Sequence, residues 1–353
     1  MAKLFICGDL LNTVTKENFF TPNMIETINK ADYAIANFEA PVVKDAKPIK
    51  KAGPNKKQNK ETISILKDVG FDLLLLANNH IFDYGEEGLK QTLEECNKHS
   101  IKTIGANLSR AKVYEPFITE IEGITFGFVN ASEAQFGALT TNNNESGYAW
   151  INHPMINNIV VQLKKENKVD YIVFFAHAGL EHYDIPLIEW RNRYRELCDL
   201  GVDCIIASHP HVPQGYELYG EKIIFYSLGN FYFPKKDNLK KVEHGYSLII
   251  DFKKDSSISF EIIYHTAENK MITQISQNES LIDFQTLNNR LESRVYDNII
   301  DSVYADAYEK ICYPYYASVF NAVINGDGVY NKIKKIIKQL FFQKRNQDKR
   351  EIL

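Results

Sequence analysis

Six separated stretches of this sequence run from an apolar segment directly into side chains that can bind a hard cation. These side chains are, in chain order, Asp9, Glu39, Asn79 with His80, His177, His209 with His211, and Asn230. A short continuous apolar run is typical of a buried parallel strand, and open α/β sheets build their sites at the carboxyl ends of such strands. We therefore expect these polar side chains to converge on one edge of a sheet.

The ligand types restrict the chemistry of such a site. Carboxylate and amide oxygens combined with imidazole, and without thiolate, favour Mn²⁺, Fe²⁺ or Zn²⁺ over a cysteine-rich structural zinc site. One or two divalent ions are expected. In a two-metal centre a bridging carboxylate holds both cations, which activate water and stabilise an oxyanion, and Glu39 is the natural candidate for the bridge.

Simpler interpretations of the same motifs exist. The SHPH and ANNH segments could be turns whose polar side chains cap the following helices, but their combination with Asp9, Glu39 and His177 favours the metal site. Gly229 and Asn230 could only permit a turn near the site. The remaining histidines have no partner pattern and are expected on the surface or in the core; those with this interpretation are His99, His153, His244 and His265.

The elements that must position these residues alternate between strand-like and helix-like from residue 1 to about 265. Helices are expected over 23–30, 61–69, 86–99, 156–166 and 187–200. The segments YSLIIDF and ISFEIIYHT predict paired antiparallel strands at a sheet edge. The pattern predicts an α/β core over 1–270, followed by a helical extension over 271–353.

The end of the chain is basic and amphipathic. Residues 330–353 contain NKIKKIIKQLFFQKRNQDKR, which could lie on a membrane surface or contact a partner complex. The alternative is a packed helix with a solvated lysine face.

Composition excludes several classes of protein. With 353 residues, 44% hydrophobic content and a formal net charge of −4, nucleic acid is not the expected partner. The five cysteines lack CxxC spacing, so buried inert thiols are expected. The first residues do not resemble a secretory signal, and no apolar stretch approaches the ~18 residues of a membrane span. We expect a cytoplasmic protein, with peripheral association at the inner face of the membrane as a further option.

Together the motifs resemble a known family. GDL at 8–10, NFEAP at 37–41, ANNHIFDYG at 77–85, HAGLE at 177–181, SHPHVPQGYE at 208–217 and YSLGNFYF at 226–233 are similar to the CapA family. These bacterial capsule and poly-γ-glutamate synthesis proteins are related to calcineurin-like metallophosphoesterases. The resemblance covers about residues 3–250 and implies a four-layer α/β/β/α metallophosphatase-like sandwich.

The resemblance also implies roles for the residues. Asp9, Glu39 and His211 would hold a first metal, and Asn79, His177 and His209 a second. His80 would be the general acid, oriented by Asp83. Residues implied to contact the substrate or support the site are Glu181, His182 and Asn230.

Two positions depart from the metallophosphoesterase pattern. Those enzymes usually have a histidine two residues after the first aspartate, whereas Leu10 and Leu11 follow Asp9 here. The bridging position carries Glu39 rather than aspartate. The first metal therefore loses one expected ligand.

The expected activity is metal-dependent hydrolysis of a phosphoester, or less favourably an amide, in the synthesis or trimming of a cell-surface polymer. The substrate would be an anionic or phosphorylated small molecule or polymer precursor. The lysine-rich segment 41–60 is either a solvated loop or a source of cations over this substrate. The alternative function is a non-catalytic or polymer-binding component of a capsule or poly-γ-glutamate synthesis complex.

Overall fold

The computed structural model describes residues 1–51, 53–141, 144–166, 168–234, 242–307 and 310. The chain divides into two compact units, Met1–Leu291 and Glu292–Leu353. The first unit thus extends past residue 270, the end of the core predicted from the sequence pattern. The basic segment 330–353 lies outside the described residues.

The first sheet contains the N-terminal strands. Its order is β16 (Met271–Gln274), β15 (Ile258–Glu268), β14 (Glu243–Phe252), β1 (Ala2–Leu10), β2 (Tyr33–Phe38), β3 (Leu73–Leu75) and β4 (Lys102–Ile104), and β13 (Asn230–Tyr232) also pairs with β1. β1 to β4 are parallel, whereas β14 and β15 are antiparallel. The predicted antiparallel pair at the sheet edge is confirmed.

The second sheet has the order β11 (Tyr216–Tyr219), β12 (Lys222–Phe225), β10 (Cys204–Ser208), β9 (Tyr171–His177), β7 (Ile124–Ser132) and β6 (Phe117–Ile121). The four inner strands are parallel, and β11 and β6 are antiparallel edge strands. β5 (Ala106–Asn107) and β8 (Gly147–Tyr148) form a small separate sheet.

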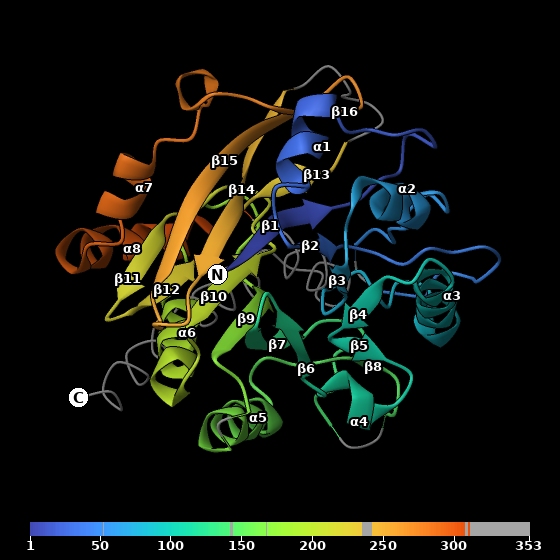
Figure 1. Cartoon of the computed structure of the whole chain (residues 1–353), viewed down its shortest axis with the longest axis horizontal. Coiled ribbons are helices and arrows are strands. Elements are labelled where there is room, and N and C mark those ends of the chain that lie inside the picture. Colours follow the sequence, from blue (N-terminus) through green and yellow to red (C-terminus); the bar gives the residue numbers. More distant parts are fainter. Residues whose placement is uncertain (52, 142–143, 167, 235–241, 308–309, 311–353) are drawn as a thin grey trace, which may run out of the picture. The chain divides into compact units, whose positions relative to one another are not determined.

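Amphipathic helices cover the outer faces of the two sheets (Figure 1). The first sheet is covered by α1 (Pro22–Ile28), α2 (Thr62–Val69) and α3 (Gly85–Lys98), and the second by α5 (Pro154–Lys165) and α6 (Ile188–Leu200). The shorter elements are α4 (Arg110–Val113), η2 (Gln277–Glu279) and α7 (Phe284–Asn289). In the second unit, α8 spans Ser293–Ala307.

Three separate hydrophobic cores define the layers. In β1, Phe5 and Cys7 pack in the core beneath the first helices, whereas Leu4 and Ile6 pack against the second sheet. This alternation follows from the two-residue period of a strand, which sends successive side chains to opposite faces. In β9, Phe174 packs beneath α5 and α6. The order helix, sheet, sheet, helix confirms the predicted four-layer α/β/β/α sandwich.

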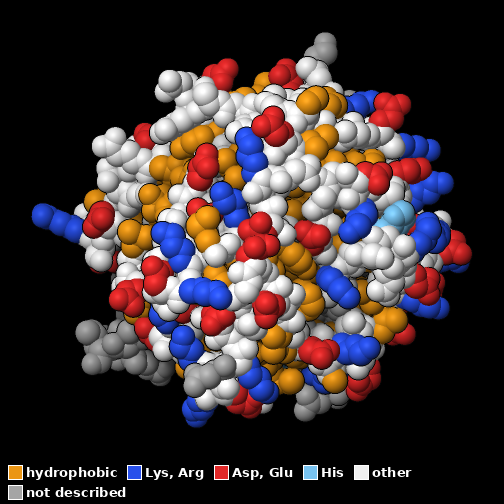
Figure 2. Space-filling model, viewed as in Figure 1, with side chains coloured by type: hydrophobic (Ala, Val, Ile, Leu, Met, Phe, Trp, Pro, Cys, Tyr) orange, Lys and Arg blue, Asp and Glu red, His pale blue; other side chains and the backbone are white. Residues whose placement is uncertain are grey.

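Acidic and basic side chains are interspersed on the face that Figure 2 shows, and no large patch of one charge is seen there. Among the helices of the described residues, none has the length and apolarity needed to cross a membrane. Four cysteines, Cys7, Cys96, Cys198 and Cys204, are buried free thiols, as expected, and Cys312 lies outside the described residues.

Candidate metal centre

The carboxyl ends of strands from both sheets supply the polar cluster. Asp9 lies near the end of β1, Glu39 follows β2, His177 ends β9, and His209 follows β10. Asn79 lies in the turn after β3. Because these ends meet at one edge of the sandwich, the structure brings together all six residues predicted as ligands, although they come from distant parts of the sequence.

Asp9 is fully buried and contacted on both oxygens. Nδ2 of Asn37 donates to Oδ1 at 2.6 Å, and the backbone N–H of His209 donates to Oδ2 at 3.2 Å. Nδ1 of His211 is 3.2 Å from Oδ2, and Nδ1 of His177 is 3.6 Å from Oδ1. Burial raises the pKa of Asp9, but the hydrogen bond and charge of His211 outweigh it and lower this pKa to about 2. Asp9 is therefore ionised at neutral pH.

Glu39 is the unusual member of the cluster. It is fully buried, and neither of its carboxylate oxygens has a hydrogen-bond partner. Its nearest cationic candidates are Nε2 of His211 at 3.7 Å and Nε2 of His80 at 3.9 Å. Burial raises the pKa of Glu39 to about 8. A buried carboxylate without partners is costly, and a divalent cation at this position would satisfy both oxygens.

Potential ligand atoms of Asp9, Glu39 and His177 lie within 4.8 Å of one another. Two carboxylates and an imidazole are a donor set that suits Mn²⁺, Fe²⁺ and Zn²⁺. The residues present therefore fit a divalent metal ion.

Imidazole and amide groups extend the cluster on the side of the second sheet. Nε2 of His177 lies 3.0 Å from Nδ1 of His209 and 3.1 Å from Oδ1 of Asn79. Burial lowers the pKa of His177 well below its usual value, and the adjacent His209 lowers it further. A neutral imidazole can offer a nitrogen lone pair to a cation, so His177, His209 and Asn79 form a second potential ligand set.

His211 connects the cluster to the open side. Its Nδ1 is shared between Oδ2 of Asp9 and Oδ1 of Asn230, which is 2.9 Å away. Burial lowers the pKa of His211, but Glu39 and Asp9 outweigh this effect and raise it to about 10. In the absence of a cation, the positive charge of His211 thus partly compensates the two carboxylates.

His80 is held by a charged pair beside the cluster. Its Nδ1 lies 2.7 Å from Oδ2 of Asp83 and 3.3 Å from Nζ of Lys51. Asp83 also forms an ion pair with Lys51 and accepts the backbone N–H of Lys56 at 2.6 Å. Asp83 and Lys51 therefore fix one ring nitrogen and leave Nε2 of His80 facing Glu39.

Two residues at the site were absent from the sequence prediction. Asn37, within β2, links Oδ1 of Asp9 to Nδ1 of His177 through its amide nitrogen at 2.6 and 3.1 Å. Glu133 follows β7 and lies 3.4 Å from Nε2 of His209. Glu133 carried the signal used for the other residues, a carboxylate directly after an apolar strand. Asn37 lies within a strand, where that signal does not apply.

The backbone is strained around the cluster. Four residues without glycine's freedom have positive φ: Ala40 (102°), His182 (68°), His209 (103°) and His211 (60°). Such conformations cost roughly 1–3 kcal/mol each and persist where the surrounding structure imposes them, often at functional sites. The strain accompanies the sharp turns that direct His211 toward Asp9 and Glu39 and His209 toward His177.

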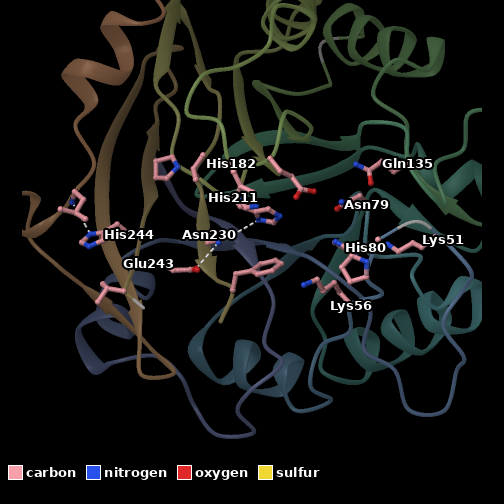
Figure 3. Close-up of a pocket in the computed structure, with 18 residues that line it drawn as sticks. Lys51, Lys56, Asn79, His80, Gln135, His182, His211, Asn230, Glu243 and His244 are labelled. Atoms are coloured by element: carbon pink, nitrogen blue, oxygen red, sulfur yellow. Dashed lines mark hydrogen bonds between the residues drawn. The ribbon is translucent and has the colours of Figure 1, made fainter. Parts of the chain in front are cut away.

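A cavity of about 510 Å³ opens over this cluster. Figure 3 shows Lys51, Lys56 and His80 toward one end, His244 toward the other, and His211 and Asn230 between them. All three residues predicted to contact substrate line the cavity: Glu181, His182 and Asn230. From the lysine-rich segment 41–60, Lys51 and Lys56 reach it, whereas Lys44 pairs with Glu95.

The position that departs from the metallophosphoesterase pattern is apolar in structure as well as in sequence. Leu11 is buried in a small cluster with Ala40 and Phe233. Phe233 in turn lies 4.7 Å from His211, measured between ring centroids. This side of the cavity offers packing rather than a further ligand.

Sequence comparison supports the family resemblance. The family described as "Bacterial capsule synthesis protein PGA_cap" matches residues 4–235. The chain is 35% identical over 218 residues to the PGA biosynthesis protein CapA of Bacillus subtilis, covering 60% of this chain and 56% of that protein. It is 33% identical over 216 residues to the capsule biosynthesis protein CapA of Bacillus anthracis, covering 59% and 52%. The chain thus spans about half the length of these curated relatives.

Solved structures align over much of the chain. The NAD nucleotidase of Haemophilus influenzae aligns at 12% identity and a TM-score of 0.46, covering 82% of this chain and 56% of that one. A calcineurin-like phosphoesterase of Bacillus subtilis aligns at 15% identity and a TM-score of 0.42, covering 86% and 99%.

Proposed function

Since this chain belongs to the bacterial capsule synthesis protein PGA_cap family, we propose that it is a metal-dependent hydrolase that cuts a phosphoester in the synthesis or trimming of a cell-surface polymer. The observation that carries this proposal is Glu39, a fully buried carboxylate whose two oxygens accept no hydrogen bond, close to Asp9 and histidines. A cation-binding role explains why it lies there.

The chain's own residues divide into two ligand sets. Asp9, Glu39 and His211 would hold one divalent ion, and the set on the other side consists of Asn79, His177 and His209. Bound divalent cations supply Lewis acidity to the phosphoryl oxygens and to an attacking water. Mn²⁺, Fe²⁺ and Zn²⁺ all suit these oxygen and nitrogen donors.

His80 is the proposed general acid. Asp83 holds Nδ1 of His80 at 2.7 Å, so the other ring nitrogen, Nε2, faces the cluster 3.9 Å from Glu39. The oxygen of an attacking water bonds to phosphorus and loses a proton to solvent, the bond from phosphorus to the leaving oxygen breaks, and that oxygen takes a proton from Nε2 of the doubly protonated His80 ring. Lys51 and Lys56 line the same end of the cavity and suit an anionic substrate.

The test is Mn²⁺-dependent hydrolysis of activated phosphomonoesters and phosphodiesters by the purified protein. His80→Ala should lower turnover while retaining bound metal, and His209→Ala should lower both. His99→Ala is the matched control, because His99 lies at the end of α3 and pairs with Glu95 instead. Loss of metal in the His80 variant equal to that in the His209 variant would refute the acid role.

A second function is favoured by one observation, the apolar surroundings of Leu11 where metallophosphoesterases usually carry a ligand. With fewer ligands on that side, the centre could bind an anionic polymer end within a capsule or poly-γ-glutamate synthesis complex without hydrolysing it. Stoichiometric metal with no turnover of any phosphoester or amide tested would favour this alternative.

A further inference from the structure

The metal cavity continues into a second hollow. This neighbouring cavity has a volume of about 330 Å³, and Val212, Pro213, His244 and Leu281 line both spaces. The two cavities therefore form one groove that runs from the metal cluster toward α7. We call this second part the α7 groove.

The lining of the α7 groove is largely apolar. Besides the shared residues, Ile282 and Leu287 contribute to it. Leu281 is 81% exposed and lines the groove. Its backbone is held in place because the N–H of Leu281 donates to Nδ1 of His244 at 3.4 Å.

The charges along the α7 groove are acidic and have partners within the protein. Asp184 forms an ion pair with Arg290, which commits that cation to the protein. Asp283 accepts a hydrogen bond from the backbone N–H of Thr286 at 3.2 Å, as the N-cap of α7. An extended polyanion would lie beside these carboxylates, so the α7 groove disfavours a negatively charged ligand.

The metal cavity, at the other end of the combined groove, has basic side chains where the α7 groove has acidic ones. Lys51 and Lys56 lie there with His80, close to the metal cluster (Figure 3). The groove thus pairs a cationic end with an apolar, mildly acidic extension. A matching ligand is anionic at one end and uncharged and apolar along the rest.

We propose that the substrate is a phosphate ester of an apolar alcohol, with its phosphoryl group at the metal cluster and its hydrocarbon body in the α7 groove. This inference rests on the proposed phosphoester hydrolysis and names the class of substrate for that site. The α7 groove binds the alcohol part, whereas the metal cluster and the two lysines bind the phosphoryl part.

The test measures binding of methyl-, butyl- and octylphosphonate to the full chain with Mn²⁺ by titration calorimetry. Each added methylene that leaves water should tighten binding by about fourfold, until the groove is filled. A phosphonate of octyl length that ends in a carboxylate should bind more weakly than octylphosphonate. Affinity that does not change with chain length, equal or tighter binding of the carboxylate ligand, or no binding of any phosphonate overturns the proposal.

Two variants locate the effect. Leu281→Ser should reduce the affinity gained between methyl- and octylphosphonate. Leu218→Ser, on β11, is the matched control: Leu218 is 65% exposed and contributes to neither cavity, so the gain should persist. Both leucines are largely exposed, so neither change should unfold the protein. If Leu281→Ser left the affinity gain with chain length unchanged, the α7 groove would not be the site that binds the hydrocarbon chain.

Failure of this inference is distinguishable from failure of the proposed function. Hydrolysis of short phosphoesters together with chain-length-independent phosphonate binding would leave the hydrolase in place and refute the apolar substrate. A chain-length gain without turnover of any ester would retain the apolar ligand while contradicting the hydrolase.

Discussion

Oε1 of Glu133 lies 3.4 Å from Nε2 of His209, while Nδ1 of the same ring lies 3.0 Å from His177 within the cluster. The carboxylate of Glu133 is itself fixed, because it accepts the amide of Gln135 at 2.7 Å and the backbone N–H of Gly179 at 3.3 Å. Glu133 therefore directs one imidazole nitrogen outward and leaves the other for a cation. Such supporting contacts orient metal ligands and raise their basicity.

Glu133→Gln should weaken Mn²⁺ binding by about 10- to 100-fold, because the neutral amide is a poorer acceptor for the imidazole N–H. Calorimetric titration of the metal-free protein measures this affinity. Glu120→Gln is the matched control, since Glu120 is exposed on β6. Unchanged affinity in the Glu133 variant would assign Glu133 to packing alone.

Lys51 should matter for catalysis rather than for metal binding. The exposed fraction of its side chain is only 4%, and its Nζ contacts both Asp83 and His80. Lys51→Met removes this cation and frees Asp83, so His80 loses its fixed orientation. We expect kcat to fall by about 10²-fold, the lower range for a misplaced general acid, with Mn²⁺ affinity retained.

The control for that experiment is Lys50→Met, an exposed neighbour in the same segment. Lys51→Arg should restore part of the activity, because the charge returns with different geometry. If Lys50→Met reduced kcat as strongly as Lys51→Met, general positive charge rather than the contact with His80 would be responsible.

Replacement of Glu39 should have opposite effects on stability in the absence and in the presence of metal. Its pKa is raised by burial from 4.5 to about 8, so ionisation of Glu39 destabilises the metal-free fold as pH rises through this range. In alkaline buffer with chelator, Glu39→Gln should therefore unfold at a higher temperature than the parent. With Mn²⁺ at a hundredfold excess over its Kd, the parent should gain about 2.7 kcal/mol and the variant much less. Equal gains for both proteins would exclude Glu39 as a ligand.

The extent to which sequence predicted this structure differs between levels. The alternating α/β core and the convergence of Asp9, Glu39 and His177 follow from local patterns, because each apolar strand ends in a polar residue and parallel strands share one carboxyl edge. The four-layer sandwich was implied by the family resemblance and not by these patterns. The apolar pattern of β1 predicts that Leu4 is buried, but it does not predict that Leu4 packs against the second sheet. Which strand faces which is decided by packing between segments far apart in sequence.

The supporting contacts were beyond the reach of sequence patterns. Asn37 looks like any strand residue, and its role depends on β1 and β9 approaching within hydrogen-bond distance of the same amide. Lys51 was one lysine among several in the segment 41–60, and only the fold shows that it reaches Asp83 while Lys44 reaches Glu95. The α7 groove is likewise built from four separate segments.

Because His265 is buried, we expect the fold to lose stability in acid. Burial lowers its pKa from 6.5 to about 4, and its Nε2 lies 3.3 Å from the carbonyl oxygen of Asn230. The unfolded chain therefore binds a proton before the folded one, and stability should fall as pH drops from 6.5 toward 4, by up to about 1.4 kcal/mol per pH unit. His265→Gln should flatten urea-unfolding free energies across this window, and parallel curves for parent and variant would contradict the assignment.

Gly8 should be intolerant of any side chain, for a reason that links the fold to the site. A Cβ at Gly8 would lie 2.1 Å from the carbonyl oxygen of Gly229, where β1 and β13 pair. Gly8→Ala must therefore push β13 away and move Asn230, which is hydrogen-bonded to His211. We expect a loss of about 1–3 kcal/mol in the free energy of unfolding, as for other overpacked cores, together with weaker Mn²⁺ binding. Chemical denaturation and metal titration measure the two effects, and a destabilised variant with parental Mn²⁺ affinity would show that β13 does not position the metal centre.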